Sequence, residues 1–142
     1  SVVDLSPLSK MKNMMSLYLS DNKIEEIGVV AELPKVWSLY LAGNPIKNFE
    51  PISRCARVDT LDLSHCELVD VGFLKPLGEL KRLMLGDNKI VDLGPLVEMA
   101  QGDSQRRFAP FWNIHLKDNP LGEAAQAQIE QLKQLGVRVH LE

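Results

Sequence analysis

Few side chains in this sequence have the type and spacing that catalysis or metal binding requires. His65 and Cys66 are adjacent, which suggests a nucleophile with its base or a pair of metal ligands. A metal site needs several ligands at a usable spacing, such as C-x-x-C or H-x-x-x-H, and neither pattern occurs. We therefore expect no catalytic residue, no metal ligand and no cofactor.

Three further features invite a chemical interpretation. Asp70 and Asp92 could form a pair of carboxylates, but they lie 22 residues apart and are more simply explained as equivalent positions of a repeat. Residues 86–89, Gly-Asp-Asn-Lys, lack the spacing of a phosphate-binding loop. His115 is the most interesting candidate, because the surrounding pattern predicts a strand from which it points outward. An ordinary surface role explains it equally well.

A repeating pattern determines where all of these residues lie. Residues 80–90 read L-x-x-L-x-L-x-x-N-x-I, and the asparagine-type position recurs at 22, 44, 66 and 88, a constant period of 22. A fifth copy follows after 31 residues and consists of Phe111, Ile114, Leu116, Asn119 and Leu121. Self-similarity at a fixed period of roughly 20–29 residues indicates a solenoid.

On these residues the chain resembles the leucine-rich repeat family, specifically its 22-residue class, which includes the bacterial internalins. The resemblance covers essentially the whole chain. It implies an α/β fold: a right-handed solenoid with a parallel concave sheet, short 3₁₀ turns on the convex side and a helical C-terminal cap. It also implies a bacterial source and favours a secreted or cell-surface location.

The period divides the chain, which we expect to be one domain. Residues 1–10 are a truncated first repeat, residues 11–98 are four 22-residue repeats, and residues 99–121 are a fifth repeat with an insertion. The polar middle of the insertion, residues 101–107, is expected to leave the core. Residues 122–142 are a C-terminal cap with an amphipathic helix and a closing strand. We expect the parent protein to continue N-terminally; alternatively, residues 2–8 are themselves a minimal cap.

Within each repeat the position predicts the role. Alternation of period 2 places the leucines of x-L-x-L-x inward in a strand. The asparagine can serve backbone groups that a buried turn leaves unpaired, and Cys66 interrupts this ladder with a weaker donor. Four of the five residues at positions 4, 26, 48, 70 and 92 are acceptors that favour N-caps of short helical turns. Phe111 is expected in the core, and Trp37 and Trp112 are expected to shield the sheet edge.

Composition and charge exclude several classes of function. The net charge of -3 and pI near 5.6 argue against nucleic-acid binding, which needs clustered Lys and Arg. No apolar run approaches the roughly 18 residues of a membrane span. Two cysteines are too few for a disulfide framework. We expect a monomer with a protein partner.

The outward strand residues form the candidate binding site. The middle position of each predicted strand is Tyr18, Tyr40, Asp62, Met84 and His115, with Arg82 beside Met84 and small residues alongside. Tyr, Met and Arg are enriched in protein interfaces. We predict partner binding through Tyr18, Tyr40, Asp62, Arg82, Met84 and His115. The alternative is that the two tyrosines merely pack on each other as cross-strand partners.

The function predicted from these residues is a non-enzymatic protein–protein interaction module that binds its partner on the concave sheet. What is known of internalin-like proteins supports this by resemblance. Two alternatives remain: a structural spacer or surface stalk, and a regulatory domain of a larger protein. Fold alone does not decide among them.

Overall fold

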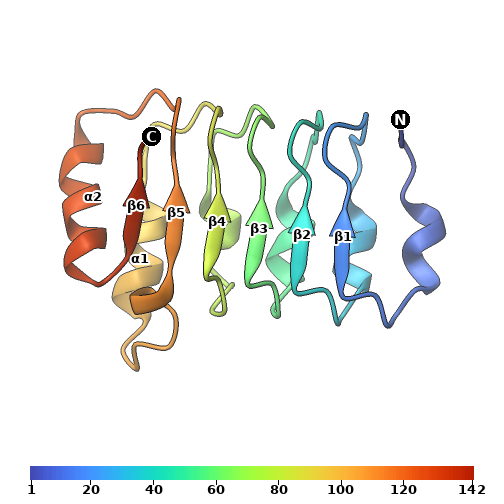
Figure 1. Ribbon diagram of the computed structural model, residues 1–142, viewed down its shortest axis with the longest axis horizontal. Coiled ribbons are helices and arrows are strands. Elements are labelled where there is room, and N and C mark those ends of the chain that lie inside the picture. Colours follow the sequence, from blue (N-terminus) through green and yellow to red (C-terminus); the bar gives the residue numbers. More distant parts are fainter.

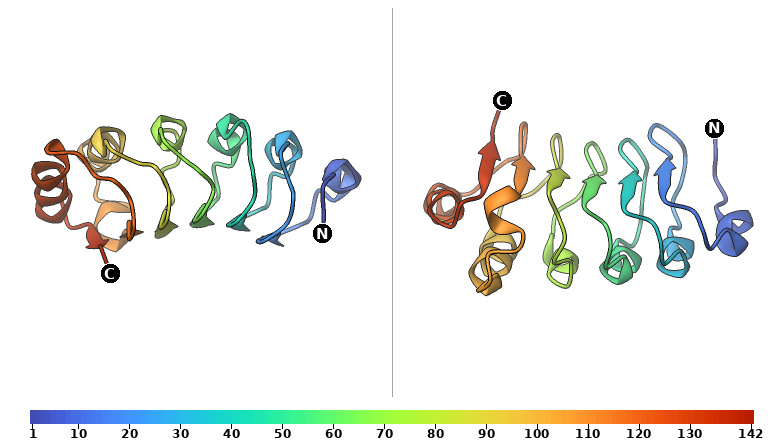
Figure 2. Two further views of the ribbon diagram at one scale, coloured as in Figure 1. Left: turned by 90° about the horizontal axis from the view of Figure 1, so that it is seen from above. Right: turned by 60° about the horizontal axis from the view of Figure 1, so that its bottom comes forward.

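Each coil of the chain contributes one short strand to a single parallel sheet. The computed structural model describes all 142 residues, and its six strands stand side by side in chain order (Figure 1). Their bounds are β1 Ser16–Tyr18, β2 Ser38–Tyr40, β3 Thr60–Asp62, β4 Arg82–Met84, β5 Asn113–His115 and β6 Arg138–His140. The views in Figure 2 show strands along one edge and helices along the other, which is the solenoid that the repeat predicted.

The leucines build the core between these two edges. Leu39, Leu61 and Leu83 pair in register across adjacent strands and are fully buried. Each repeat buries its apolar side against its neighbours, so stacking is what makes the core continuous. The N-terminal end is more open: Val2 is 40% and Met11 50% exposed, although the same repeat positions are buried further along.

Short 3₁₀ helices form the convex edge, as predicted. They are η1 Ser6–Lys10, η2 Gly28–Glu32, η3 Glu50–Arg54 and η4 Gly72–Leu74. A fifth 3₁₀ helix, η5 Ala109–Phe111, lies directly before β5 and not on the convex edge (Figure 2). The acceptors expected as N-caps lie one residue earlier: Asp4, Asn48 and Asp70 accept the amide two residues on at 2.8–3.0 Å. Glu26 does not, because its longer side chain does not form this compact turn.

One convex segment differs from the prediction. Gly94–Gly102 is an α-helix, α1, of nine residues, where a short turn was expected. The insertion lengthens this repeat, and Leu96, Val97, Met99 and Ala100 supply a stripe that the helix buries. The carboxylate of Asp103 then accepts the backbone amides of residues 107, 108 and 109 at 2.8–3.0 Å. The insertion is thereby anchored, while residues 104–107 are exposed.

The asparagine ladder forms as expected. The Nδ2 of Asn44 donates to the carbonyls of Leu19 and Leu41 at 2.8 and 2.9 Å, and its Oδ1 accepts the Ile24 amide at 3.1 Å. Asn88 makes the equivalent contacts. Cys66 donates weakly to the Leu41 carbonyl at 3.4 Å and has no oxygen to offer. The Ile46 amide, left without that oxygen, bonds to the Asn44 carbonyl instead.

The prediction for the two aromatic residues before β5 was wrong. Phe111 is 57% exposed, and Trp112 is fully buried. The insertion changes the path into β5, so Trp112 enters the core and packs edge-on against Phe108 with ring centroids 5.3 Å apart. Its indole Nε1 has no hydrogen-bond partner. Trp37 remains 42% exposed beside the sheet, as expected.

The C-terminal cap consists of a helix and the last strand. The helix α2 spans Ala124–Gln134 and buries Ala125, Ile129 and Leu132, while β6 pairs with β5. Gln128 links the cap to the preceding repeat, because its Nε2 donates to Asp92 at 2.7 Å and its Oε1 accepts the Leu93 amide at 2.9 Å. The cap closes the core and extends the sheet by one strand.

Candidate recognition face

The outward side chains of the six strands form what we call the concave face. The pairing register aligns Tyr18, Tyr40, Asp62, Met84, His115 and His140 in one column. Neighbouring strands lie about 4.8 Å apart, so this column is continuous. The face is turned toward the viewer in Figure 1, with most of the helices behind it. The small residues Ser20, Ala42 and Ser64 flank the column on one side.

Tyr18 and Tyr40 stack on each other at one end of this column. Their ring centroids lie 4.8 Å apart at an interplanar angle of 9°. This is the cross-strand packing that the alternative interpretation expected. The stack still leaves Tyr18 73% exposed, whereas Tyr40 is half-buried. A partner can therefore cover the exposed surface of this aromatic stack.

Asp62, Met84 and Arg82 occupy the middle of the concave face. The carboxylate of Asp62 accepts the Ser64 amide at 3.0 Å, which fixes its direction. Met84 is half-buried between Asp62 and His115 in the column. Arg82 is exposed and makes no ion pair. The centre thus presents one oriented anion, one adaptable apolar side chain and one free guanidinium.

A stacked histidine pair ends the column, and only one of its members was predicted. His115 and His140 have ring centroids 4.4 Å apart at an angle of 12°. The ring nitrogen Nε2 of His140 lies 3.1 Å from Oδ1 of Asn113. Burial lowers the pKa of His115, and the nearby His140 and Arg82 lower it further, against a small opposing effect of Asp62. The alternation of the closing strand could have placed Arg138 and His140 on its outward side, but the alignment of His140 with His115 depends on the register of β6.

Apart from His115, the residues considered for catalytic chemistry lie away from this face. Cys55 and Cys66 are buried thiols, and burial raises the pKa of Cys55 to about 11 and raises that of Cys66. A thiol with a raised pKa is a poor nucleophile at neutral pH. His65 is exposed and pairs with Asp87 of the next repeat, and both adopt positive φ in the turn before the ladder position. No group of three or more candidate metal ligands is present.

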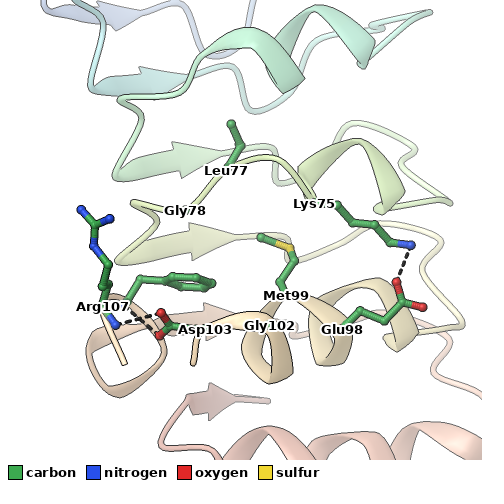
Figure 3. Close-up of a pocket in the computed structure, with 9 residues that line it drawn as sticks. Lys75, Leu77, Gly78, Glu98, Met99, Gly102, Asp103 and Arg107 are labelled. Atoms are coloured by element: carbon green, nitrogen blue, oxygen red, sulfur yellow. Dashed lines mark hydrogen bonds and ion pairs between the residues drawn. The ribbon is translucent and has the colours of Figure 1, made fainter. Parts of the chain in front are cut away.

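A hollow of about 420 Å³ lies between η4 and α1 and is drawn in Figure 3. It contains Met99 and Phe108 on its apolar side. Its polar groups are already paired, since Lys75 contacts Glu98 and Asp103 accepts backbone amides. None of the predicted site residues lines it. The hollow therefore offers no free polar group for a specific small ligand.

Part of the chain matches a known repeat family, and the whole chain is similar in fold to solved repeat proteins. Residues 1–46 match the family model described as leucine rich repeat. A leucine-rich repeat protein of Leptospira interrogans has a similar structure, with a TM-score of 0.81, 23% identity, and coverage of 99% of this chain and 35% of that one. A search of curated proteins finds no match.

Two internalins of Listeria monocytogenes also have similar structures. Internalin F matches with a TM-score of 0.68 and 21% identity over 99% of this chain and 46% of its own. Internalin C2 matches with a TM-score of 0.58 and 23% identity over 100% of this chain and 77% of its own. At such identities the likeness establishes the fold. The chain spans less than half of the Leptospira protein and of internalin F, and none of its helices is long and apolar enough to cross a membrane.

Proposed function

We propose that this chain, a solenoid of leucine-rich repeats like those of bacterial internalins, is a non-enzymatic protein-recognition module that binds its partner on the concave face. Proteins built from these repeats generally act in protein–protein interaction. The observation that carries the proposal is the continuous column of Tyr18, Tyr40, Met84 and His115, which is rich in residue types that favour interfaces. We propose that the chain binds as a monomer.

The side chains of the concave face have distinct roles in this proposal. The tyrosine stack supplies aromatic contact area, and because stacking restricts the rings, binding costs less conformational entropy than for two separate side chains. Met84 adapts its shape to the partner. Arg82 and Asp62 favour a partner that places opposite charges against them, and this complementarity contributes specificity more than affinity.

The experiment compares variants of the concave face with a matched aromatic variant elsewhere. A partner recovered by affinity capture is purified and titrated calorimetrically against wild type, Tyr40→Ala and Met84→Ala. We expect Tyr40→Ala to weaken binding by about 2 kcal/mol or more, the usual hot-spot threshold. Phe111→Ala removes an aromatic ring that is 57% exposed in η5, outside the concave face, and is expected to bind normally.

The opposite pattern would reject the concave face. If Tyr40→Ala and Met84→Ala bind as wild type does while Phe111→Ala loses binding, the partner contacts another surface. If affinity capture with the whole chain recovers no partner, the structural spacer becomes the better explanation. The tyrosine stack is then only a packing contact between repeats.

A further inference from the structure

Charge divides the concave face into two halves. The outward residues of β1 and β2, which are Ser16, Tyr18, Ser38 and Tyr40, carry no formal charge. From β3 to the C-terminus the face carries three cations, Arg82, Lys117 and Arg138, against two carboxylates, Asp62 and Glu142. None of the three cations makes an ion pair. Three cations against two carboxylates give the side chains of this half a net charge of +1, in a chain whose net charge is -3.

The stacked imidazoles lie within this cationic half. Arg82 on β4 and Arg138 on β6 both pair with Asn113 on β5. Each arginine therefore lies one outward position before the histidine column. Lys117 and Glu142 follow the two histidines at the next outward positions, and Asp62 lies beyond Met84 in the same column. Two protonated rings at this separation repel each other and the neighbouring guanidinium groups. Burial and the charges of His140 and Arg82 therefore lower the pKa of His115, and a bound anion opposes this effect.

We infer that the half of the concave face formed by Arg82, His115, Arg138 and His140 receives an acidic segment of the protein partner and takes up protons as it binds. Charge complementarity selects the occupant: Arg82 and Arg138 can form charge-assisted hydrogen bonds with carboxylates, and each protonated imidazole adds a donor. The uncharged tyrosine half receives the adjoining apolar part of the same segment. This inference rests on the proposed function and specifies the partner's chemistry.

Proton linkage gives the expected direction of the pH dependence. In the free protein the pKa of His115 lies below its ordinary value, because of burial, His140 and Arg82. A bound carboxylate favours the imidazolium form and raises that pKa. Binding therefore takes up protons, and affinity rises as pH falls through the pKa of the complex. The affinity stops rising once the pH is below the pKa of His115 in the free protein.

The test uses the intact chain and a defined probe, an acetylated and amidated hexaglutamate peptide. Nuclear magnetic resonance titrations at pH 8.0 and 5.5 follow both the backbone amides and the imidazole carbons. Glutamate has an ordinary pKa of about 4.3 and stays mostly ionised over this range. We expect perturbations at residues 82, 113–115 and 138–140 and an affinity at least tenfold higher at pH 5.5. Hexalysine is expected not to bind there.

The third histidine provides the matched control. His65 lies in an exposed turn and pairs with Asp87, so His65→Gln removes one titrating group without changing the concave face. We expect His65→Gln to keep the pH dependence, whereas His115→Gln/His140→Gln loses it and Arg82→Gln weakens binding at both pH values. Binding that is independent of pH, a pH dependence unchanged in the double variant, or perturbations outside the concave face would each overturn the inference.

The two proposals fail separately. If hexaglutamate does not bind the concave face but Tyr40→Ala still weakens the natural partner, the acidic segment is wrong and concave recognition stands. If the natural partner ignores the tyrosine half while hexaglutamate binds as described, the His and Arg cluster is an anionic peptide site and the proposed function of the whole face is wrong.

Discussion

At the residue scale, the ladder position shows how one side chain replaces missing backbone partners. Asn44, Asn88 and Asn119 each donate to carbonyls of their own and the preceding coil and accept an amide of the preceding coil. Asn22, in the first complete coil, donates only within its own coil. Buried backbone groups without such partners cost about 1–3 kcal/mol each. The single substitution in the ladder, Cys66, keeps weak donation to the Leu41 carbonyl but leaves the Ile46 amide to a local bond.

Replacing the cysteine by the ladder residue therefore tests this explanation. Cys66→Asn is expected to stabilise the fold by up to about 1 kcal/mol, because its Oδ1 can accept the Ile46 amide. The measurement is urea unfolding followed by circular dichroism. Cys55→Asn is the matched control: Cys55 occupies an apolar core position, so an amide buried there is expected to destabilise. A destabilised Cys66→Asn variant would show that the site is too apolar for an amide.

The aromatic residues before β5 supply a second test at this scale. Trp112→Ala is expected to destabilise by about 3–5 kcal/mol, as large core truncations do. Trp112→Phe is expected to cost much less, because it keeps most of the ring volume and removes an indole N–H that has no partner. Phe111→Ala is expected to change the unfolding free energy by less than about 0.5 kcal/mol. If both alanine variants lost the same unfolding free energy, Phe111 would have to be a core residue, as the sequence predicted.

At the element scale, the insertion changes a 3₁₀ turn into a helix without breaking the solenoid. The helix α1 buries four apolar residues, and Asp103 directly after it accepts three amides that the loop would otherwise leave unpaired. Burial of Asp103 opposes its ionisation, but the amides of residues 109, 107 and 108 and the charge of Arg106 hold its pKa below the ordinary value. The Asp103 carboxylate thus holds the inserted segment in place through these three hydrogen bonds.

Removing the Asp103 carboxylate is expected to lower the free energy of unfolding by an amount that depends on pH. Asp103→Ala is expected to destabilise by about 1–3 kcal/mol at pH 7, measured by urea unfolding. Because the folded pKa is lowered, the stabilisation is present above the unfolded pKa of about 3.9 and is lost as pH falls below it. The difference from wild type should therefore shrink at low pH. Gln105→Ala, an exposed position in the same segment, is the control and is expected to be neutral. A neutral Asp103→Ala would mean that water replaces the carboxylate at no cost.

At the scale of the whole molecule, stability is shared between neighbouring coils, so the ends matter most. The helix α2 packs on α1, and β6 covers the edge of β5. Because each coil buries its apolar side only against its neighbours, losing the cap exposes the core of the coil before it. The same cap supplies Arg138 and His140 to the concave face, so it joins stability to the proposed recognition.

Deleting residues 122–142 is accordingly expected to cause aggregation, detected by size-exclusion chromatography with light scattering. Deleting only residues 141–142, which lie beyond β6 and are exposed, is the control and should leave the elution unchanged. A monomeric, cooperatively unfolding chain that ends at residue 121 would show that α2 and β6 are an appendage and not a cap.

The sequence by itself determined everything that follows from the period. A period of 22 places the leucines, the ladder and the outward columns, because each residue's environment is the same from one coil to the next. Tyr18, Tyr40, Asp62, Arg82 and Met84 could therefore be assigned to one face before any coordinates were considered. That they bind a partner stays a prediction, because geometry alone does not test binding.

Only the tertiary structure decided what happens where the period breaks. At the insertion, the choice between Phe111 and Trp112 for the core depends on the path that α1 and Asp103 impose, and no local pattern encodes that path. At the cap, the partner of His115 depends on the register of β6, which is fixed by the docking of α2 through Gln128 and its buried residues. Both outcomes arise from contacts between segments with no repeat relation, and such contacts leave no periodic signal in the sequence.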